Sequence, residues 1–265
     1  MTALIALHDG ETVRILTDAA LTRLTDGVLA KVRSKQIRLE NGVVIAGAGT
    51  WQPCCRFAAL ADELANFDEL ADAAQDLWKQ ALAPMSAKDR EAPGGLIVAG
   101  LSEKVGGPDM LVIEMPGSKL SDSAVAYAIG PHSNSREFTG RFLKRFADDP
   151  DAFDVRAEGL LVMEALRRHC PRHYEEAICP AIGGFIQLTT VTRDGIETEV
   201  LHHWPDRIGQ SIDPDATADL ETRDESFWGT TFAEVYRMRE NLAAWPGLPA
   251  EAILPWPSGD ERMRD

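Results

Sequence analysis

The sequence predicts an α+β fold that opens with strands and continues with helices. Two hairpins are indicated in the first fifty residues, because apolar runs flank the dipeptides Asp9-Gly10 and Asn41-Gly42, which favour tight turns between antiparallel strands. Two stretches with helical spacing of apolar residues follow, at 51–67 and 68–82, and strand-like runs come after them. Separate runs of strands and of helices are typical of an α+β protein.

The opening region contains four predicted strands, at 3–7, 12–17, 36–39 and 43–45. The residues between the second and third strands are expected to form a loop, with Asp18 at its start and Lys35 at its end. The region closes on the small-residue run Ala46-Gly47-Ala48-Gly49-Thr50. Polar groups are therefore expected to gather at the ends of the two hairpins.

The remaining elements are predicted from the same periodicities and from glycine and proline punctuation. Strands are expected at 96–101, 110–115, 125–129, 185–191 and 197–202, and helices at 136–146 and 154–169. From Pro205 the chain becomes acidic and poor in apolar residues, which predicts an extended linker to residue 225. A terminal helix within 226–245 and a Pro/Trp-rich tail complete the chain. We therefore divide the sequence into a domain at 1–204 and an extension at 205–265.

The tail carries Trp245 and Trp256 between prolines, a composition that excludes a regular helix. Two interpretations stay open. It is a clasp that contacts its own domain or a neighbouring subunit, or it is a tail without contacts.

Composition narrows the classes of function. The 265 residues carry a formal charge of -15, which disfavours binding to nucleic acid and to anionic membrane surfaces. No apolar run reaches the length of a membrane helix, and no secretory signal pattern is visible at the start. The four cysteines show neither a paired framework nor a Cys-x-x-Cys spacing. We expect reduced thiols and a cytoplasmic protein.

The first fifty residues resemble the opening of a proteasome β subunit or of the bacterial HslV-type peptidase, members of the N-terminal-nucleophile (Ntn) hydrolases. In that family the nucleophile is a threonine at the mature N-terminus, and Thr2 takes this place once Met1 is removed. Asp18 matches the family's acidic residue, Lys35 matches its lysine if one residue is inserted in the preceding loop, and Gly49 matches the glycine whose N–H binds the oxyanion. The resemblance implies a four-layer αββα sandwich, here with a C-terminal extension.

The chemistry explains why these residue types are needed. A threonine hydroxyl is a weak nucleophile, and the α-amine of the same residue can act as its base near neutral pH. A lysine ammonium beside Thr2 would favour the neutral amine, Asp18 would hold Lys35 in place, and Gly49 would stabilise the oxyanion. Taken singly, each residue also has an ordinary structural interpretation: Asp18 as a turn cap, Lys35 as a solvated charge and Gly49 as a helix-entry glycine.

The resemblance also implies a substrate pocket next to the scissile bond. The matching positions are Leu21, Arg33, Ile37, Gly47 and Trp51, and Arg33 indicates tolerance for an acidic side chain. The resemblance implies no cofactor. A metal site is disfavoured because Pro171 separates His169 from His173 and ends the helix that would place them on one face.

Two departures from the family pattern put catalysis in question. Where the family has an auxiliary serine, this chain has Pro131, followed by His132 and Ser133; these two are either auxiliary catalytic residues or part of a helix N-terminus. Before the Gly183-Gly184 pair, the aspartate and serine of eukaryotic-type subunits are replaced by Cys179 and Ile182.

The leading hypothesis is a threonine peptidase that hydrolyses peptide or other amide bonds. The resemblance implies a ring-shaped homo-oligomer, a peptide or unfolded protein as substrate, and a possible ATP-dependent unfoldase as partner. One rival is a catalytically inactive assembly or binding protein, because a retained Met1 would convert the Thr2 amine into an amide. Another is an amidase acting on a small molecule.

Overall fold

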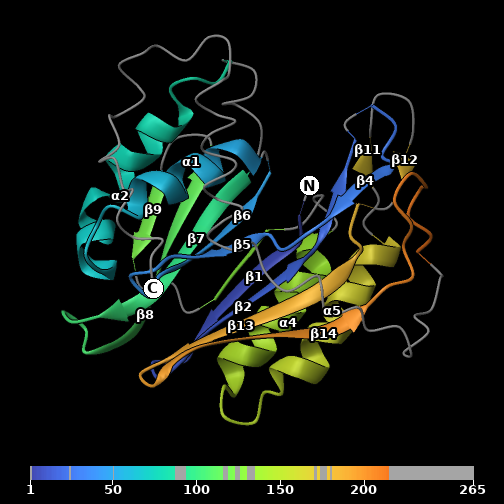
Figure 1. The fold of residues 1–265 in the computed structure, drawn as a ribbon. Helices are drawn as coiled ribbons and strands as arrows, with labels where there is room; N and C mark the ends of the chain where they lie inside the picture. The colour runs from blue at the N-terminus through green and yellow to red at the C-terminus, as the bar shows by residue number, and fades with distance from the viewer. Residues whose placement is uncertain are drawn as a thin grey trace, which may run out of the picture.

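Two five-stranded antiparallel sheets form the centre of the fold (Figure 1). The computed structural model describes residues 2–23, 25–49, 51–86, 94–115, 119–122, 126–129, 135–169, 172–173, 178–179 and 181–214. The first sheet has the order β10 (Ala126–Ile129), β1 (Leu4–His8), β2 (Val13–Asp18), β13 (Phe185–Thr192) and β14 (Gly195–His203). The second has the order β5 (Gln36–Arg38), β6 (Val44–Ala48), β7 (Gly94–Ser102), β8 (Gly107–Met115) and β9 (Lys119–Asp122).

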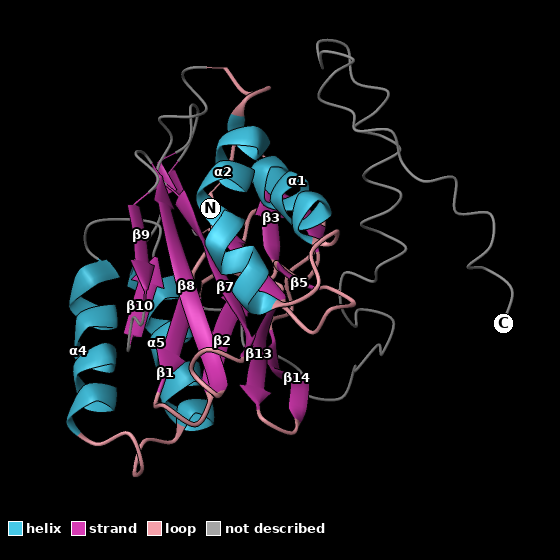
Figure 2. Cartoon of the chain, turned by 90° about the vertical axis from the view of Figure 1, so that its left-hand side faces the viewer, coloured by secondary structure: helices cyan, strands magenta, loops and turns pink. Residues whose placement is uncertain are grey.

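The helices cover the outer faces of the two sheets. Helices α1 (Trp51–Ala61) and α2 (Phe67–Leu82) pack on the second sheet, and α4 (Ser135–Asp148) and α5 (Val155–His169) pack on the first. Figure 2 looks onto the first pair, with α1 and α2 in front of the strands. The result is the four-layer αββα sandwich that the resemblance implies. Within the described ranges, no helix combines the length and the apolar composition needed to cross a membrane.

The alternation of side chains along β1 shows how the layers are built. Leu4 and Ala6 point into the core between the sheets, whereas Ile5 and Leu7 belong to the core beneath α4 and α5. All four are fully buried. Successive residues of a strand face opposite sides, so a strand covered on both faces is apolar at every position.

The break between α1 and α2 has a local cause. Asn66 has an extended backbone and accepts a hydrogen bond from the Glu69 N–H at 2.9 Å, while Glu69 accepts from the Ala65 N–H at 2.8 Å. Such a cap starts a new helix. The helix predicted at 51–67 therefore ends at Ala61, and Phe67 is the first residue of α2.

The two hairpins predicted in the first fifty residues are confirmed, since β1 pairs with β2 and β5 with β6. The strands predicted at 185–191 and 197–202 pair with each other as β13 and β14. The prediction of a loop between Asp18 and Lys35 is wrong, because this stretch contains the hairpin of β3 (Ala20–Thr22) and β4 (Leu29–Val32). A second short hairpin joins β11 (Arg172–His173) and β12 (Ile178–Cys179).

The structure describes the first ten residues of the predicted linker. Residues 205–214 pack against the domain, where Leu29 exchanges backbone hydrogen bonds with Gln210 and Gly209 at 2.9 and 2.8 Å. Ile212 is 3% exposed and packs against Ala20 and Leu29. The predicted terminal helix and the Pro/Trp-rich tail lie outside the described residues, so the domain division stays a prediction.

Candidate active site

A buried ion pair joins the end of β2 to the start of β5. Lys35 Nζ lies 2.8 Å from Asp18 Oδ1 and 2.9 Å from Asp18 Oδ2. Both residues are fully inaccessible to solvent. Burying two charges is costly unless each is paired and hydrogen-bonded, so the surroundings of the Asp18 carboxylate matter.

Three backbone N–H groups complete the coordination of that carboxylate. Ala3 N–H donates to Oδ1 at 3.0 Å, while Ala20 N–H and Gly183 N–H donate to Oδ2 at 3.2 and 3.3 Å. The Asp18 N–H in turn donates to the Ala3 carbonyl at 3.4 Å. One side chain thus ties together the N-terminal segment, the β3–β4 hairpin and the turn before β13.

Lys35 is the basic member of the site. Burial lowers the pKa of Lys35 below its ordinary value, and the Asp18 charge and hydrogen bonds oppose this effect. The lowered pKa of Lys35 is the type of perturbation that clusters at functional sites. The backbone holds this residue too, because its carbonyl accepts a hydrogen bond from Gly47 N–H at 3.2 Å.

Thr2 adjoins this ion pair through the backbone. It directly precedes Ala3, whose N–H shares Asp18 Oδ1 with Lys35 Nζ. Thr2 is 3% exposed. The predicted nucleophile is therefore one residue from a group bound to the predicted acid, although the catalytic roles stay a prediction.

Gly49 lies between the end of β6 and the start of α1. Its φ is +98°, a conformation that glycine adopts without steric cost. It follows Gly47, which binds the Lys35 carbonyl, by two residues. An N–H at the entry to a helix is suited to binding negative charge. The oxyanion role of Gly49 stays a prediction.

The predicted pocket residues lie in two settings. Leu21 is on β3, and Arg33 directly follows β4, with its guanidinium carbon 5.1 Å from the centre of the Trp51 ring. Ile37 is fully buried in the core beneath α1 and α2. A Cβ at Gly47 would lie 2.6 Å from Cys54 Sγ, so only glycine fits there. Arg33 and Trp51 are thus in contact, whereas Ile37 lies in the core.

The two departures from the family pattern fall in different places. His132 and Ser133 lie outside the described residues, so their auxiliary role is untested. Ile182 is 1% exposed and packs in the core beneath α5, and Cys179 lies in β12. Among the described residues, no three His, Cys, Asp or Glu side chains gather as a metal site would require.

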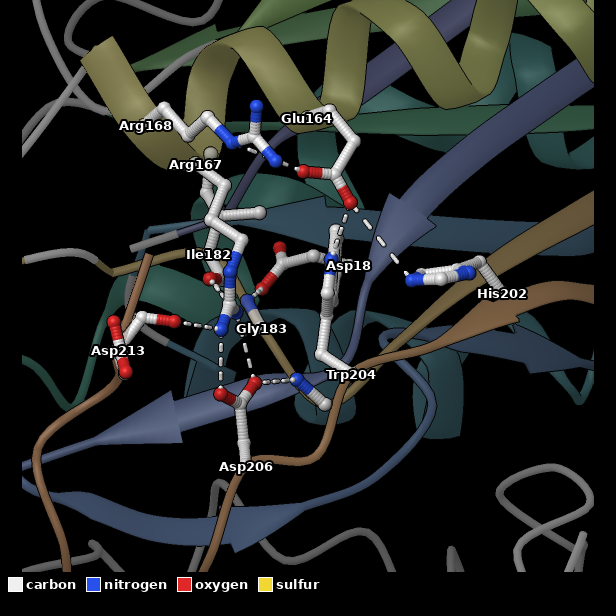
Figure 3. A network of polar contacts seen from close by, with 11 residues as sticks. Asp18, Glu164, Arg167, Arg168, Ile182, Gly183, His202, Trp204, Asp206 and Asp213 are labelled. Carbon is white, nitrogen blue, oxygen red and sulfur yellow. Dashed lines mark hydrogen bonds and ion pairs between the residues drawn. The ribbon is translucent and has the colours of Figure 1, made fainter. Parts of the chain in front are cut away.

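Sequence reasoning missed a second buried ion pair behind the turn before β13 (Figure 3). Arg167 on α5 binds Asp206, and their side chains are 0% and 1% exposed. A signal was present, because Arg167 stands four residues after the buried Met163 and so on the same helical face. A charged residue on an apolar face predicts a buried partner.

Comparison with known proteins places the fold. No family model and no curated protein matches the sequence. Among solved structures, the chain is similar to an Anbu (Gly-1) mutant from Hyphomicrobium sp. strain MC1, with a TM-score of 0.53 and 14% identity over 76% of this chain and 88% of that one. Anbu has the proteasome-like Ntn-hydrolase fold. The chain therefore shares that fold, which confirms the architecture that the resemblance implies.

Proposed function

We propose that the protein is a proteasome-like threonine peptidase that hydrolyses peptide or other amide bonds after removal of Met1. One observation carries the proposal: the fully buried Lys35–Asp18 pair binds the backbone of Ala3, the residue after Thr2. A structural role alone does not require a lysine here, because apolar residues of similar volume often replace a buried pair without loss of stability. The shared fold with Anbu supports the same class of protein.

In the proposed reaction the free α-amine of Thr2 accepts the hydroxyl proton while Oγ attacks the carbonyl carbon of the substrate. The C–O bond that forms gives a tetrahedral oxyanion, which the Gly49 N–H stabilises. The C–N bond then breaks, and the leaving amine takes the proton from the Thr2 ammonium. The remaining ester is hydrolysed by a water molecule that the amine deprotonates, which regenerates Thr2.

Lys35 acts by its charge in this scheme. A buried ammonium close to the α-amine disfavours protonation of that amine and stabilises negative charge on Oγ. Asp18 keeps Lys35 in place without approaching the substrate. The three N–H groups at its oxygens keep the carboxylate in one orientation.

The proposal extends to the assembly. Proteasome-like chains form rings, and we infer a self-compartmentalising homo-oligomer in the cytoplasm that degrades peptides or unfolded proteins, with an ATP-dependent unfoldase as a possible feeder. Size-exclusion chromatography with light scattering tests the ring, and a monomer at micromolar concentration would contradict it.

The deciding experiment is intact mass spectrometry of the protein made in its native host, with and without an epoxyketone or β-lactone probe. The enzyme predicts loss of Met1 and one probe molecule on Thr2. A retained Met1 without labelling would refute the peptidase.

A second candidate function is a catalytically inactive assembly or binding protein of the same fold. The burial of Thr2, which is 3% exposed, favours it, because a nucleophile must be reachable by substrate. Ring assembly together with a retained Met1 would support this candidate.

A further inference from the structure

Arg167 and Asp206 form a bidentate ion pair that is inaccessible to solvent. Arg167 Nη1 lies 2.9 Å from Asp206 Oδ2, and Nη2 lies 2.7 Å from Oδ1. The guanidinium carbon is 4.8 Å from the centre of the Trp204 ring, a cation–π contact. Arginine is suited to such a planar fork and ring contact, and lysine is not.

Both members of the pair form hydrogen bonds with the backbone of the turn formed by Ile182, Gly183 and Gly184. Arg167 Nη1 donates to the Ile182 carbonyl at 2.9 Å, and Gly184 N–H donates to Asp206 Oδ2 at 2.7 Å. A Cβ at Gly183 would collide with the Asp206 carboxylate and lie 2.9 Å from Arg167 Nη1. Gly184 has a φ of +76°. The two glycines are therefore needed for the turn to approach the pair this closely.

The other side of the turn faces Asp18. Gly183 N–H donates to Asp18 Oδ2 at 3.3 Å, and the Gly183 carbonyl accepts from Ala19 N–H at 3.0 Å. Gly183 thus contacts Asp18 and the residue after it, while Arg167 and Asp206 hold the residues on both sides of Gly183. In Figure 3, Gly183 lies next to the Arg167–Asp206 pair, and its N–H is bound to Asp18.

A segment of chain from Trp204 onward holds the pair in place. Trp204 N–H donates to the Gly184 carbonyl at 2.9 Å, and the indole Nε1 donates to Glu164 Oε1 at 2.7 Å. Arg167 also binds the Asp213 carbonyl. The segment from 204 to 213 therefore closes over the guanidinium and excludes water from it.

We propose that Arg167 and Asp206 are a positioning pair, which holds the Gly183-Gly184 turn so that Gly183 N–H fixes the Asp18 carboxylate against Lys35. The proposal rests on the proposed function, because it assigns the pair to the same site. Neither residue contacts the proposed nucleophile, so both act through the turn. A small displacement of Asp18 would move Lys35 relative to Thr2, and displacements of about 1 Å in an active site cost about 100-fold in rate.

The test compares Asp206→Asn with Glu199→Gln, a matched control. Glu199 pairs with Arg156 on the same helix as Arg167, at 2.7 Å, but these two side chains are 41% and 66% exposed. A positioning role predicts that Asp206→Asn lowers kcat for a fluorogenic peptide by about 10- to 100-fold with little change in KM. Glu199→Gln should leave both constants unchanged. Unchanged kcat in Asp206→Asn would overturn the proposal.

Amide hydrogen exchange provides a second measurement that does not depend on activity. In Asp206→Asn, exchange should accelerate at Gly183 and Gly184 and also at Ala3 and Ala20, whose N–H groups bind Asp18. Acceleration limited to the glycines would show that the turn does not hold Asp18 and would overturn the proposal. If the wild-type protein has no peptidase activity, only the proposed function is refuted. The exchange measurement would still show whether Asp206 affects the N–H groups that bind Asp18. If Asp206→Asn does not fold, Arg167→Lys serves in both measurements, with the same expected changes.

Discussion

Lys35 and Asp18 form a salt bridge in which Nζ lies within 2.9 Å of both carboxylate oxygens and neither side chain reaches solvent. The pair crosses from one sheet to the other, because Asp18 ends β2 and Lys35 precedes β5. The neighbouring Gln36 makes a similar crossing, with its Nε2 atom 3.0 Å from Thr17 Oγ1. Polar groups at this end of the sandwich therefore replace the apolar core found along the strands.

Replacing one partner of this pair should destabilise the protein more than replacing both partners together. We expect Asp18→Asn and Lys35→Met each to lower the free energy of unfolding by about 3–5 kcal/mol, because each leaves a buried group without its partner. The double variant should recover part of the loss. Urea denaturation followed by fluorescence measures all three. Additive losses would show that the two side chains do not interact energetically.

Thr2→Ala should abolish turnover without affecting the fold. The hydroxyl is the proposed nucleophile, so its removal leaves no atom to form the acyl-enzyme. Thr2→Ser is the matched control, because it keeps the hydroxyl and should retain measurable activity. Peptide hydrolysis and size-exclusion chromatography are the measurements. Full activity of Thr2→Ala would contradict the mechanism.

Much of the fold could be predicted from local patterns. The Asp9-Gly10 and Asn41-Gly42 turns marked hairpins, and helical spacing marked four helices within two or three residues except at the end of α1. The β3–β4 hairpin was missed because its strands of three and four residues are too short to show alternation. Short strands of this kind depend on tertiary pairing.

Some residues of the candidate site could be recognised from the sequence, and others could not. Asp18 and Lys35 were recognised from the resemblance, since two residues flanking a predicted loop give no local sign of forming a pair. Asp206 was missed because it stands in an acidic, polar stretch, where composition does not distinguish one buried carboxylate from its solvated neighbours. The distance of 39 residues between Arg167 and Asp206 puts their pairing beyond local reasoning.

Arg33 should determine a preference for acidic side chains next to the scissile bond. Its guanidinium lies against Trp51 beside the β3–β4 hairpin, where it would meet a substrate carboxylate with a bidentate contact. We expect Arg33→Ala to lower kcat/KM for a substrate with glutamate at that position by about tenfold relative to leucine. The control is Lys31→Ala, an exposed cation on β4. An equal loss for both substrates would contradict the assignment.

The activity should depend on pH through two groups. The α-amine of Thr2 must be neutral, so kcat/KM should rise as pH passes its pKa, ordinarily about 7.7–8.0. Lys35 must be charged, so activity should fall as pH rises through the pKa of Lys35, which burial places below the ordinary 10.5. Lys35→Arg should weaken this alkaline loss, because arginine keeps its proton. An unchanged alkaline limb in Lys35→Arg would show that another group causes it.

A loss of stability on deprotonation of Lys35 does not explain the fall in activity at alkaline pH. Between the lowered pKa of folded Lys35 and 10.5, the unfolded chain binds more protons at this residue than the folded chain does. Stability contributed by Lys35 therefore rises with pH in this window. Circular dichroism across the same pH range checks this point. A fall in activity with the spectrum intact would assign the alkaline limb to the chemistry of the site.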